Sequence, residues 1–311
     1  MKILLIRNDN IGDLLCTTPS IEALRKKYPN SQIDIVVNNY NFMAIDKNPF
    51  VNTIYTYTKP KHKKGIFNKI KALIGKITIM SKIFFTKYDV SIVFRSGYSS
   101  SAEQFSNLSG AKTRIGVKDN KGKDNFNEYV LFDEDDHEVE FSYKCVASLG
   151  ILPSNEKLFF YLPENYKDKY KNLENYILIH ISARMKNNKY SKEKFKEIID
   201  SIDENIIISA EPSDIENAKW IERNTKANFI KTSSFLDLCG LISNSKLFIT
   251  LEGGAMHVAP ALGIKTIALF GVSNINRWHP WGYKDLVIQD KTKIAENIAP
   301  SLVIQKIKGN L

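Results

Sequence analysis

The stretch LFITLEGGAMHVAPALGIKTIALFG, residues 247–271, decides the fold class of this chain. An apolar run at 247–251 is followed by Glu252, two glycines, a short helical segment at 255–262 and a second apolar run at 266–270. Two apolar runs on either side of a short helix are typical of a parallel β-α-β unit. We therefore expect a parallel sheet whose turns carry the functional residues.

The Gly253-Gly254 turn of this unit has two interpretations. Glycines between a strand and a helix let backbone N–H groups approach a ligand, and the helix dipole favours an anion such as a pyrophosphate. His257 would reach the same anion from the first turns of the helix. The structural alternative is that the glycines only turn the chain and that His257 is an ordinary helix histidine, since Gly-Gly is less specific than a complete phosphate-loop motif.

The same alternation of strands and helices runs through all 311 residues, which exceeds the usual length of one domain. In the first half we predict strands at 2–7, 33–37, 51–57 and 90–94, a short strand at a sheet edge at 112–117, and helices at 13–27, after 101, and at 141–149. In the second half we predict strands at 176–181, 205–209, 229, 247–251 and 266–270, and helices at 192–202, 214–223, 236–243 and 255–262.

This order predicts an α/β protein with two doubly wound parallel sheets that face each other across an interdomain cleft. The expected domains are residues 1–165 and 175–295, with a linker near 153–175. Residues 296–311 are apolar enough for a C-terminal helix, which we expect to cross back to the first domain.

Asp13 stands where the first strand passes into the first helix. A carboxylate there is often a helix cap. The alternative is a carboxylate at the C-terminal edge of a parallel sheet, where open α/β sheets bind ligands and where it would act as a general base.

A basic segment at 59–87 carries nine lysines and no acidic residue, which accounts for most of the net charge of +10. Apolar residues are interleaved with these lysines, so we favour basic amphipathic helices lying on an anionic surface over a solvated linker. The acidic run at 133–138 contains an Asp-x-Asp triplet of the kind that can hold a metal, but no apolar strand precedes it, and we favour a solvated loop.

The chain shows no targeting or membrane-spanning pattern. Its N-terminus, MKILLIRNDN, enters a strand directly, and no run approaches the roughly 20 apolar residues of a span. Cys16, Cys145 and Cys239 are scattered, which favours a reduced, cytoplasmic compartment. No nucleic-acid-binding module is recognisable, so nucleic acid is not an expected partner.

Several of these motifs together resemble glycosyltransferase family 9, the ADP-heptose:lipopolysaccharide heptosyltransferases. The matching positions are Ile11-Gly12-Asp13, Thr18-Pro19, Leu24, Arg114-Ile115-Gly116, and residues 254–259, 261–263 and 269–271. They keep the family's order and spacing over nearly the whole chain. The resemblance implies a GT-B architecture of two Rossmann-like domains. It also implies transfer of heptose from ADP-heptose to the lipopolysaccharide inner core with inversion, without a metal or cofactor.

The resemblance also implies roles for individual residues. Asp13 matches the general base that deprotonates the acceptor hydroxyl, and Gly12 lets the chain turn so that this carboxylate faces the cleft. Ser182 and either Lys186 or Lys189 match phosphate contacts, and Asp214 lies near the carboxylate that binds the ribose. The implied donor-binding set is Ser182, Lys186, Lys189, Asp214, Glu252, Gly253, Gly254, Met256 and His257.

On the acceptor side, the basic segment occupies the region that approaches an anionic glycolipid at the inner face of the cytoplasmic membrane. The implied contacts there are Gly12, Lys59, Lys61, Lys63 and Lys64.

Two departures from the family pattern affect the donor side. Glu252-Gly253 replaces the usual Asp-Ser/Thr, and Tyr190-Ser191 replaces the usual Trp-Pro. The alternatives are therefore a family member that uses another nucleotide sugar, a GT-B-like nucleotide-sugar epimerase or hydrolase, and a noncatalytic protein that binds anionic lipid.

Overall fold

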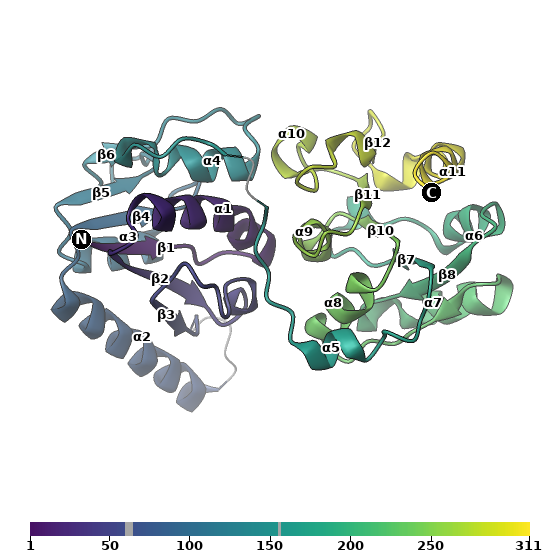
Figure 1. Ribbon diagram of the computed structural model, residues 1–311, viewed down its shortest axis with the longest axis horizontal. Helices are drawn as coiled ribbons and strands as arrows, with labels where there is room; N and C mark the ends of the chain where they lie inside the picture. Colours follow the sequence, from purple (N-terminus) through teal and green to yellow (C-terminus); the bar gives the residue numbers. More distant parts are fainter. Residues whose placement is uncertain (60–64, 155–156) are drawn as a thin grey trace. The chain divides into compact units, whose positions relative to one another are not determined.

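The computed structural model describes residues 1–59, 65–154 and 157–311. The chain divides into two compact units, Met1–Tyr161 and Leu162–Leu311, each built on its own parallel sheet (Figure 1). We call them unit 1 and unit 2. The division between them falls within the predicted linker at 153–175.

Unit 1 is built around a parallel sheet with the strand order β3-β2-β1-β4-β5-β6 within the described residues. Its strands are β1 (Lys2–Ile6), β2 (Gln32–Asn38), β3 (Thr53–Tyr57), β4 (Val90–Val93), β5 (Thr113–Gly116) and β6 (Glu128–Tyr129). Its helices are α1 (Ile11–Lys27), α2 (Ile66–Thr86), α3 (Ser100–Leu108) and α4 (Glu138–Lys144). Strand order reverses between β1 and β4, which is the topological switch point of a Rossmann-like sheet.

Unit 2 repeats this topology, with the strand order β12-β11-β10-β7-β8-β9. Its strands are β7 (Tyr176–His180), β8 (Asn205–Ser209), β9 (Asn228–Phe229), β10 (Leu247–Leu251), β11 (Thr266–Phe270) and β12 (Val287–Gln289). Its helices are α5 (Glu164–Asp168), α6 (Lys192–Asp200), α7 (Ile215–Asn224), α8 (Phe235–Ser243), α9 (Gly254–Ala261), α10 (Ile275–Trp278) and α11 (Pro300–Lys308). The switch point lies between β7 and β10.

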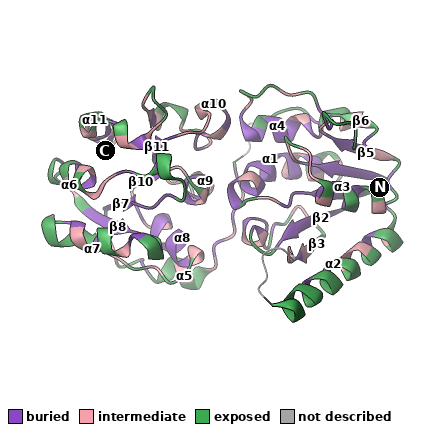
Figure 2. Ribbon diagram, turned by 180° about the vertical axis from the view of Figure 1, so that it is seen from behind, coloured by how far each residue is buried: buried purple, intermediate pink, exposed green. Residues whose placement is uncertain are grey.

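Alternation along the strands of unit 2 produces two hydrophobic layers. Ile177 and Ile179 of β7 lie in one cluster with side chains from α6, α7 and α11. Tyr176 and Leu178 of the same strand lie in the other cluster, with side chains from α8 and α9. Both faces of the sheet are therefore covered by helices, and Figure 2 shows buried strands between helices with exposed outer faces.

Unit 1 is covered in the same way. Ile83 of α2 and Phe105 of α3 pack in one cluster with Leu4 and Ile6 of β1, while α1 and α4 contact each other. No helix in the described part of the chain has the length and apolar character needed to span a bilayer.

Three sequence expectations need correction. Strand β5 is not at the sheet edge, because the two-residue strand β6 pairs with it. The predicted linker contains helix α5. The C-terminal helix α11 is part of unit 2, where Val303 and Ile307 are fully buried in the cluster that also contains Phe195 of α6.

Candidate functional site

In unit 1, the polar residues after β1 gather at the switch point. Arg7 follows β1 directly and is only 1% exposed. Its Nη2 atom donates to Asp13 Oδ1 at 2.9 Å and to Glu138 Oε1 at 2.7 Å, and Nη1 donates to the Phe94 carbonyl after β4. One buried guanidinium therefore links β1, β4, α1 and α4.

Asp13 lies in the first turn of α1, and its side chain is 14% exposed. The N-cap residue of α1 is Asn10, and the hydrogen bond to Arg7 directs the Asp13 carboxylate toward the end of β1. Asp13 is therefore not the helix cap, and that interpretation is wrong. The carboxylate instead belongs to an ion-pair network at the C-terminal edge of the sheet, where open α/β sheets bind ligands.

Asp9 is the third carboxylate on Arg7. Its Oδ1 atom lies 2.9 Å from Arg7 Nε, and its Oδ2 atom lies 3.5 Å from Arg95 Nη1. Burial raises the pKa of Asp9 to about 6, although Arg7 opposes this rise. Burial by itself lowers the pKa of Arg7, but Asp9, Glu138 and Asp13 outweigh it and raise that pKa, so the guanidinium stays charged.

Amide side chains hold the backbone of the loop after β1. Asn38 Nδ2 donates to the carbonyls of Asn8 and Asp9, and Asn41 Nδ2 donates to the carbonyl of Arg7. Asn8 in turn donates to the Tyr57 hydroxyl at 2.8 Å. The loop that precedes Asp13 is thus fixed by buried hydrogen bonds.

Glu138 was not expected at this site, since the sequence placed it in a solvated acidic loop. Residues 133–135 are exposed, as predicted. His137 and Glu138, however, are buried. Glu138 is the first residue of α4, and His137 is its N-cap residue in a capping box. In the described part of the chain, no group of three or more His, Cys, Asp or Glu side chains is placed to hold a metal ion.

In unit 2, the Gly-Gly turn lies at the matching switch point, where Gly253 is the N-cap of α9. A Cβ atom on Gly253 would meet no atom within 4 Å, and its φ of 171° is extended backbone. Nothing inside the protein therefore demands glycine at this position.

Glu252 precedes this turn. Its Oε1 atom accepts a hydrogen bond from Ser273 Oγ after β11. Its Oε2 atom is buried and has no hydrogen-bond partner among the described residues. An unsatisfied buried carboxylate oxygen is costly unless a ligand donates to it.

Two further predicted residues lie on α9. His257 is 5% exposed, and its ring lies 6.1 Å from that of Trp278 in an edge-on arrangement. Met256 packs against Ala268 and Phe270 in the core. The structure therefore places Met256 beneath the helix rather than at the surface.

The loop after β7 carries the predicted phosphate contacts. Ser182 is buried, and its Oγ atom accepts a hydrogen bond from Glu211 N at 2.9 Å, which joins this loop to the one after β8. Lys186 begins a 3-10 turn, η4 (Lys186–Asn188). The Oδ1 atom of Asn188 at its end accepts a hydrogen bond from Val272 N at 3.1 Å. A Cβ atom on Gly271 would lie 2.2 Å from Asn188 Oδ1, so glycine is required for this close packing.

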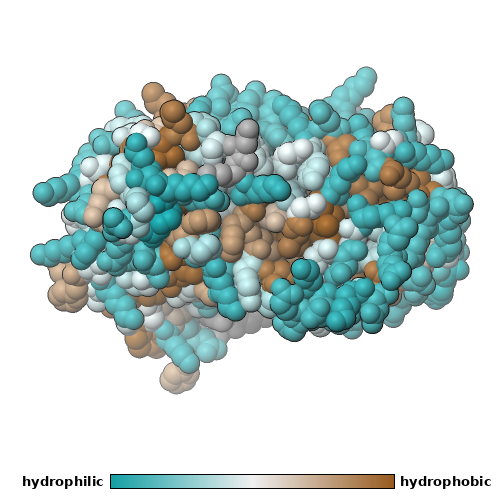
Figure 3. Space-filling view, in the orientation of Figure 1, coloured by the Kyte–Doolittle hydropathy of each residue, from teal (hydrophilic) through white to brown (hydrophobic). Residues whose placement is uncertain are grey.

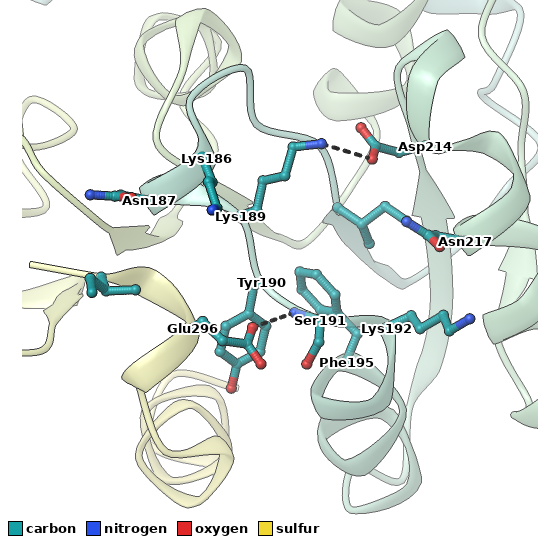
Figure 4. A pocket seen from close by; sticks show the side chains of 12 residues that line it. Lys186, Asn187, Lys189, Tyr190, Ser191, Lys192, Phe195, Asp214, Asn217 and Glu296 are labelled. Carbon is teal, nitrogen blue, oxygen red and sulfur yellow. Dashed lines mark hydrogen bonds and ion pairs between the residues drawn. The ribbon is translucent and has the colours of Figure 1, made fainter.

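A pocket of about 560 Å³ lies beside this loop (Figure 4). Lys186, Lys189 and Asp214 line it together, and Lys189 Nζ lies 3.6 Å from Asp214 Oδ1. The remaining lining residues are Ile181, Asn187, Tyr190, Ser191, Lys192, Phe195, Asn217, Ile294 and Glu296. Glu252, Gly253 and His257 do not line this pocket.

Two of these lining residues, Tyr190 and Glu296, were not expected at the site, and neither was His180, which does not line the pocket. The rings of Tyr190 and Phe195 pack edge to face, with centroids 5.1 Å apart, and together they line one side of the pocket. Glu296 Oε2 accepts from Ser191 N at 2.7 Å. His180, the last residue of β7, is buried beside Ser209 Oγ, and burial lowers its pKa to about 4, against the effect of Asp214, so its imidazole is neutral at pH 7. Of these three residues, only Tyr190 was marked in the sequence, by the departure from the family pattern at Tyr190-Ser191.

The predicted acceptor residues are only partly described. Gly12 is buried in the first turn of α1, and Lys59 is partly exposed. Lys61, Lys63 and Lys64 lie outside the described residues.

Two Rossmann-like units, each with polar residues at its switch point, define an α/β protein of the class whose sheets bind ligands at that position. A family model described as glycosyltransferase family 9 (heptosyltransferase) matches residues 79–306. The chain belongs to this family and is a glycosyltransferase.

Individual relatives agree with this placement. Lipopolysaccharide heptosyltransferase 3 of Escherichia coli (strain K12) is 24% identical over 294 residues, which cover 87% of this chain and 82% of the relative. The family 9 glycosyltransferase from Veillonella parvula DSM 2008 has a TM-score of 0.84 and 20% identity, over 99% of this chain and 96% of its own. E. coli heptosyltransferase WaaC, solved with ADP-2-deoxy-2-fluoro heptose, has a TM-score of 0.79 and 16% identity over 100% of both chains. The solved structures support the two-unit fold.

Proposed function

We propose that this enzyme transfers heptose from ADP-heptose to a lipopolysaccharide inner core or a related surface glycan, with inversion at the anomeric carbon. This proposal rests mainly on one contact: Arg7 holds the Asp13 carboxylate at the switch point of unit 1. Asp13 takes the proton of the acceptor hydroxyl, the acceptor oxygen bonds to the anomeric carbon, and the bond from that carbon to the diphosphate breaks. The proposed reaction releases ADP and uses no metal ion or cofactor.

Unit 2 supplies the groups for the donor in this proposal. The diphosphate lies at the N-terminus of α9 against the Gly253-Gly254 backbone, where N–H groups and the helix dipole favour an anion. Lys189 or Lys186 offsets the charge that develops on the leaving group. Asp214, which lies beside Lys189, accepts hydrogen bonds from the ribose.

Glu252 is proposed to contact the donor sugar. Its buried Oε2 atom has no hydrogen-bond partner among the described residues, so a sugar hydroxyl would satisfy it. Because glutamate replaces the family's aspartate here, the favoured second candidate is transfer from another nucleotide sugar.

The test measures product from ADP-heptose and a core oligosaccharide, as ADP released and as the mass of the glycan. Native enzyme should form both products, whereas Asp13→Asn and Asp13→Ala should form neither and should bind ADP with unchanged affinity. Full transfer by Asp13→Asn would refute the base assignment. Donor consumed without any acceptor would indicate an epimerase or hydrolase, and turnover of a different sugar nucleotide would support the second candidate.

We also place the reaction at an anionic membrane surface, where a glycolipid acceptor is presented. The noncatalytic alternative is set aside because the chain belongs to a glycosyltransferase family.

A further inference from the structure

Helix α2 exposes an unusually apolar face. Eight large apolar side chains along it are between 48% and 85% exposed: Ile66, Phe67, Ile70, Leu73, Ile74, Ile77, Phe84 and Phe85. Figure 2 shows most of this helix as exposed, and brown side chains project over it at the lower left of Figure 3. Contiguous apolar surface on this scale marks a site of contact with a partner or a membrane.

The exposed face lies opposite the face that packs on unit 1. Ala72 and Ile83 are buried, and Ile79 and Met80 pack against the unit 1 core. At about 100° per residue, the eight exposed side chains fall within an arc of roughly 120° centred away from this packed face. Ser81 is the one polar residue within that arc.

Lysines lie on both flanks of the exposed arc, and α2 contains no acidic residue. By the same helical spacing, Lys69 lies on one flank, and Lys71 and Lys82 lie on the other. Lys76 differs from them, because it lies toward the packed side, donates to Gln104 Oε1 at 2.8 Å and has its pKa lowered by burial. The flanking lysines are therefore available to a surface, while Lys76 supports the fold.

We propose that the exposed face of α2 docks on an anionic lipid surface, with the helix axis in the plane of the headgroups. An apolar arc with lysines at its edges suits this position, because the apolar side chains enter the acyl boundary while the ammonium groups meet lipid phosphates. A second copy of the chain fits poorly. Pairing two α2 faces would bring lysines against lysines, with no carboxylate on either helix to offset them.

The membrane contact by α2 rests on the proposed function, which places the reaction at an anionic membrane surface. Vesicle binding needs neither donor nor acceptor, so its failure would leave the transfer proposal intact. Conversely, Asp13→Asn should bind vesicles as the native protein does.

The experiment measures co-sedimentation of the full-length protein with vesicles of phosphatidylcholine alone or mixed with phosphatidylglycerol. Native protein should bind the anionic vesicles at least about tenfold more tightly, and added NaCl should weaken this binding. Phe67→Ser/Phe85→Ser and Lys71→Glu/Lys82→Glu should each reduce binding by about tenfold or more. The matched controls, Leu131→Ser/Leu152→Ser and Lys121→Glu/Lys123→Glu, change exposed residues elsewhere in unit 1 and should bind normally.

Insertion is tested separately from adsorption. In a Phe85→Trp variant, brominated lipids should quench more fluorescence than in native protein. Equal binding to both vesicle types, or unchanged binding by both α2 double variants, would overturn the proposal. It would also be overturned if Phe67→Ser/Phe85→Ser converted a dimer to a monomer without weakening vesicle binding, because a second copy would then cover the face.

Discussion

Arg7 contacts Asp9, Asp13 and Glu138 through one buried guanidinium. Its planar fork of donors can serve several carboxylates at fixed angles, which the single ammonium of a lysine cannot do. The position of Asp13 therefore depends on Glu138, a residue 131 positions further along the chain than Arg7. This dependence makes Glu138 a positioning residue in the proposed reaction.

Replacing Glu138 with Gln should lower kcat for transfer by about tenfold to a hundredfold, because a buried charge-assisted hydrogen bond contributes roughly 1.5–3 kcal/mol. The KM for the donor should stay unchanged, since the proposed donor residues lie in unit 2. Steady-state kinetics would show this split. Glu134→Gln, an exposed change in the preceding loop, is the control. An equal rise in donor KM would contradict a positioning role.

Gly253→Ala should leave the melting temperature unchanged, because its Cβ atom would meet open space on extended backbone. It should weaken ADP binding by about tenfold or more, since the methyl group would occupy the approach of the diphosphate to the backbone. Calorimetric titration with ADP checks this result. Gly75→Ala on α2, which also meets open space, should bind ADP normally. Normal binding by Gly253→Ala would remove the turn from the donor site.

At the element scale, a carboxylate fixes the start of α8. Asp237 is 1% exposed and accepts from Lys169 Nζ at 2.7 Å, from Tyr170 Oη at 2.9 Å and from Ser233 N at 2.7 Å. Burial favours the neutral acid, but these donors outweigh it and lower the pKa of Asp237 to about 2. Asp237 therefore ties the segment after α5 to the positive end of the α8 dipole.

Asp237→Asn should lower the free energy of unfolding of unit 2 by about 2 kcal/mol at pH 7, from a pKa shift of nearly two units. A depressed carboxylate pKa stabilises the folded state above the unfolded pKa near 4, and this contribution is lost as pH falls toward 2. Urea unfolding at pH 7 and near pH 3 should therefore show a smaller difference between variant and native protein at the lower pH. Asp168→Asn, an exposed change on α5, should shift stability by less than about 0.5 kcal/mol. If Asp237→Asn lost the same free energy of unfolding at both pH values, the effect would come from packing and not from the carboxylate charge.

The sequence predicted those elements whose apolar runs are continuous. The strands at 205–209, 247–251 and 266–270 have the predicted bounds, because such runs mark buried parallel strands. It missed α10 and β12, which are too short to show a period. It also missed the pairing of Arg7 with Glu138, since no local pattern reports a contact between residues so far apart in the chain.

At the scale of the whole molecule, the same strand order occurs twice, once in each unit. Each unit has its own hydrophobic clusters and its own switch point. The predicted base lies in unit 1, and the predicted donor residues lie in unit 2. Nucleotide binding and transfer should therefore be separable, whereas the interdomain cleft stays a prediction.

Residues 162–311 expressed alone should fold cooperatively, because unit 2 has a complete sheet with helices on both faces. This fragment should bind ADP within about threefold of the affinity of the full chain, a difference below roughly 0.7 kcal/mol. It should form no glycan product, because Asp13 is absent. Calorimetry and a transfer assay on the same preparation test both points, with Gly253→Ala in the fragment as the control that must weaken ADP binding. A folded fragment with no affinity for ADP would show that unit 1 contributes directly to the donor site, and the assignment of the donor residues to unit 2 alone would then fail.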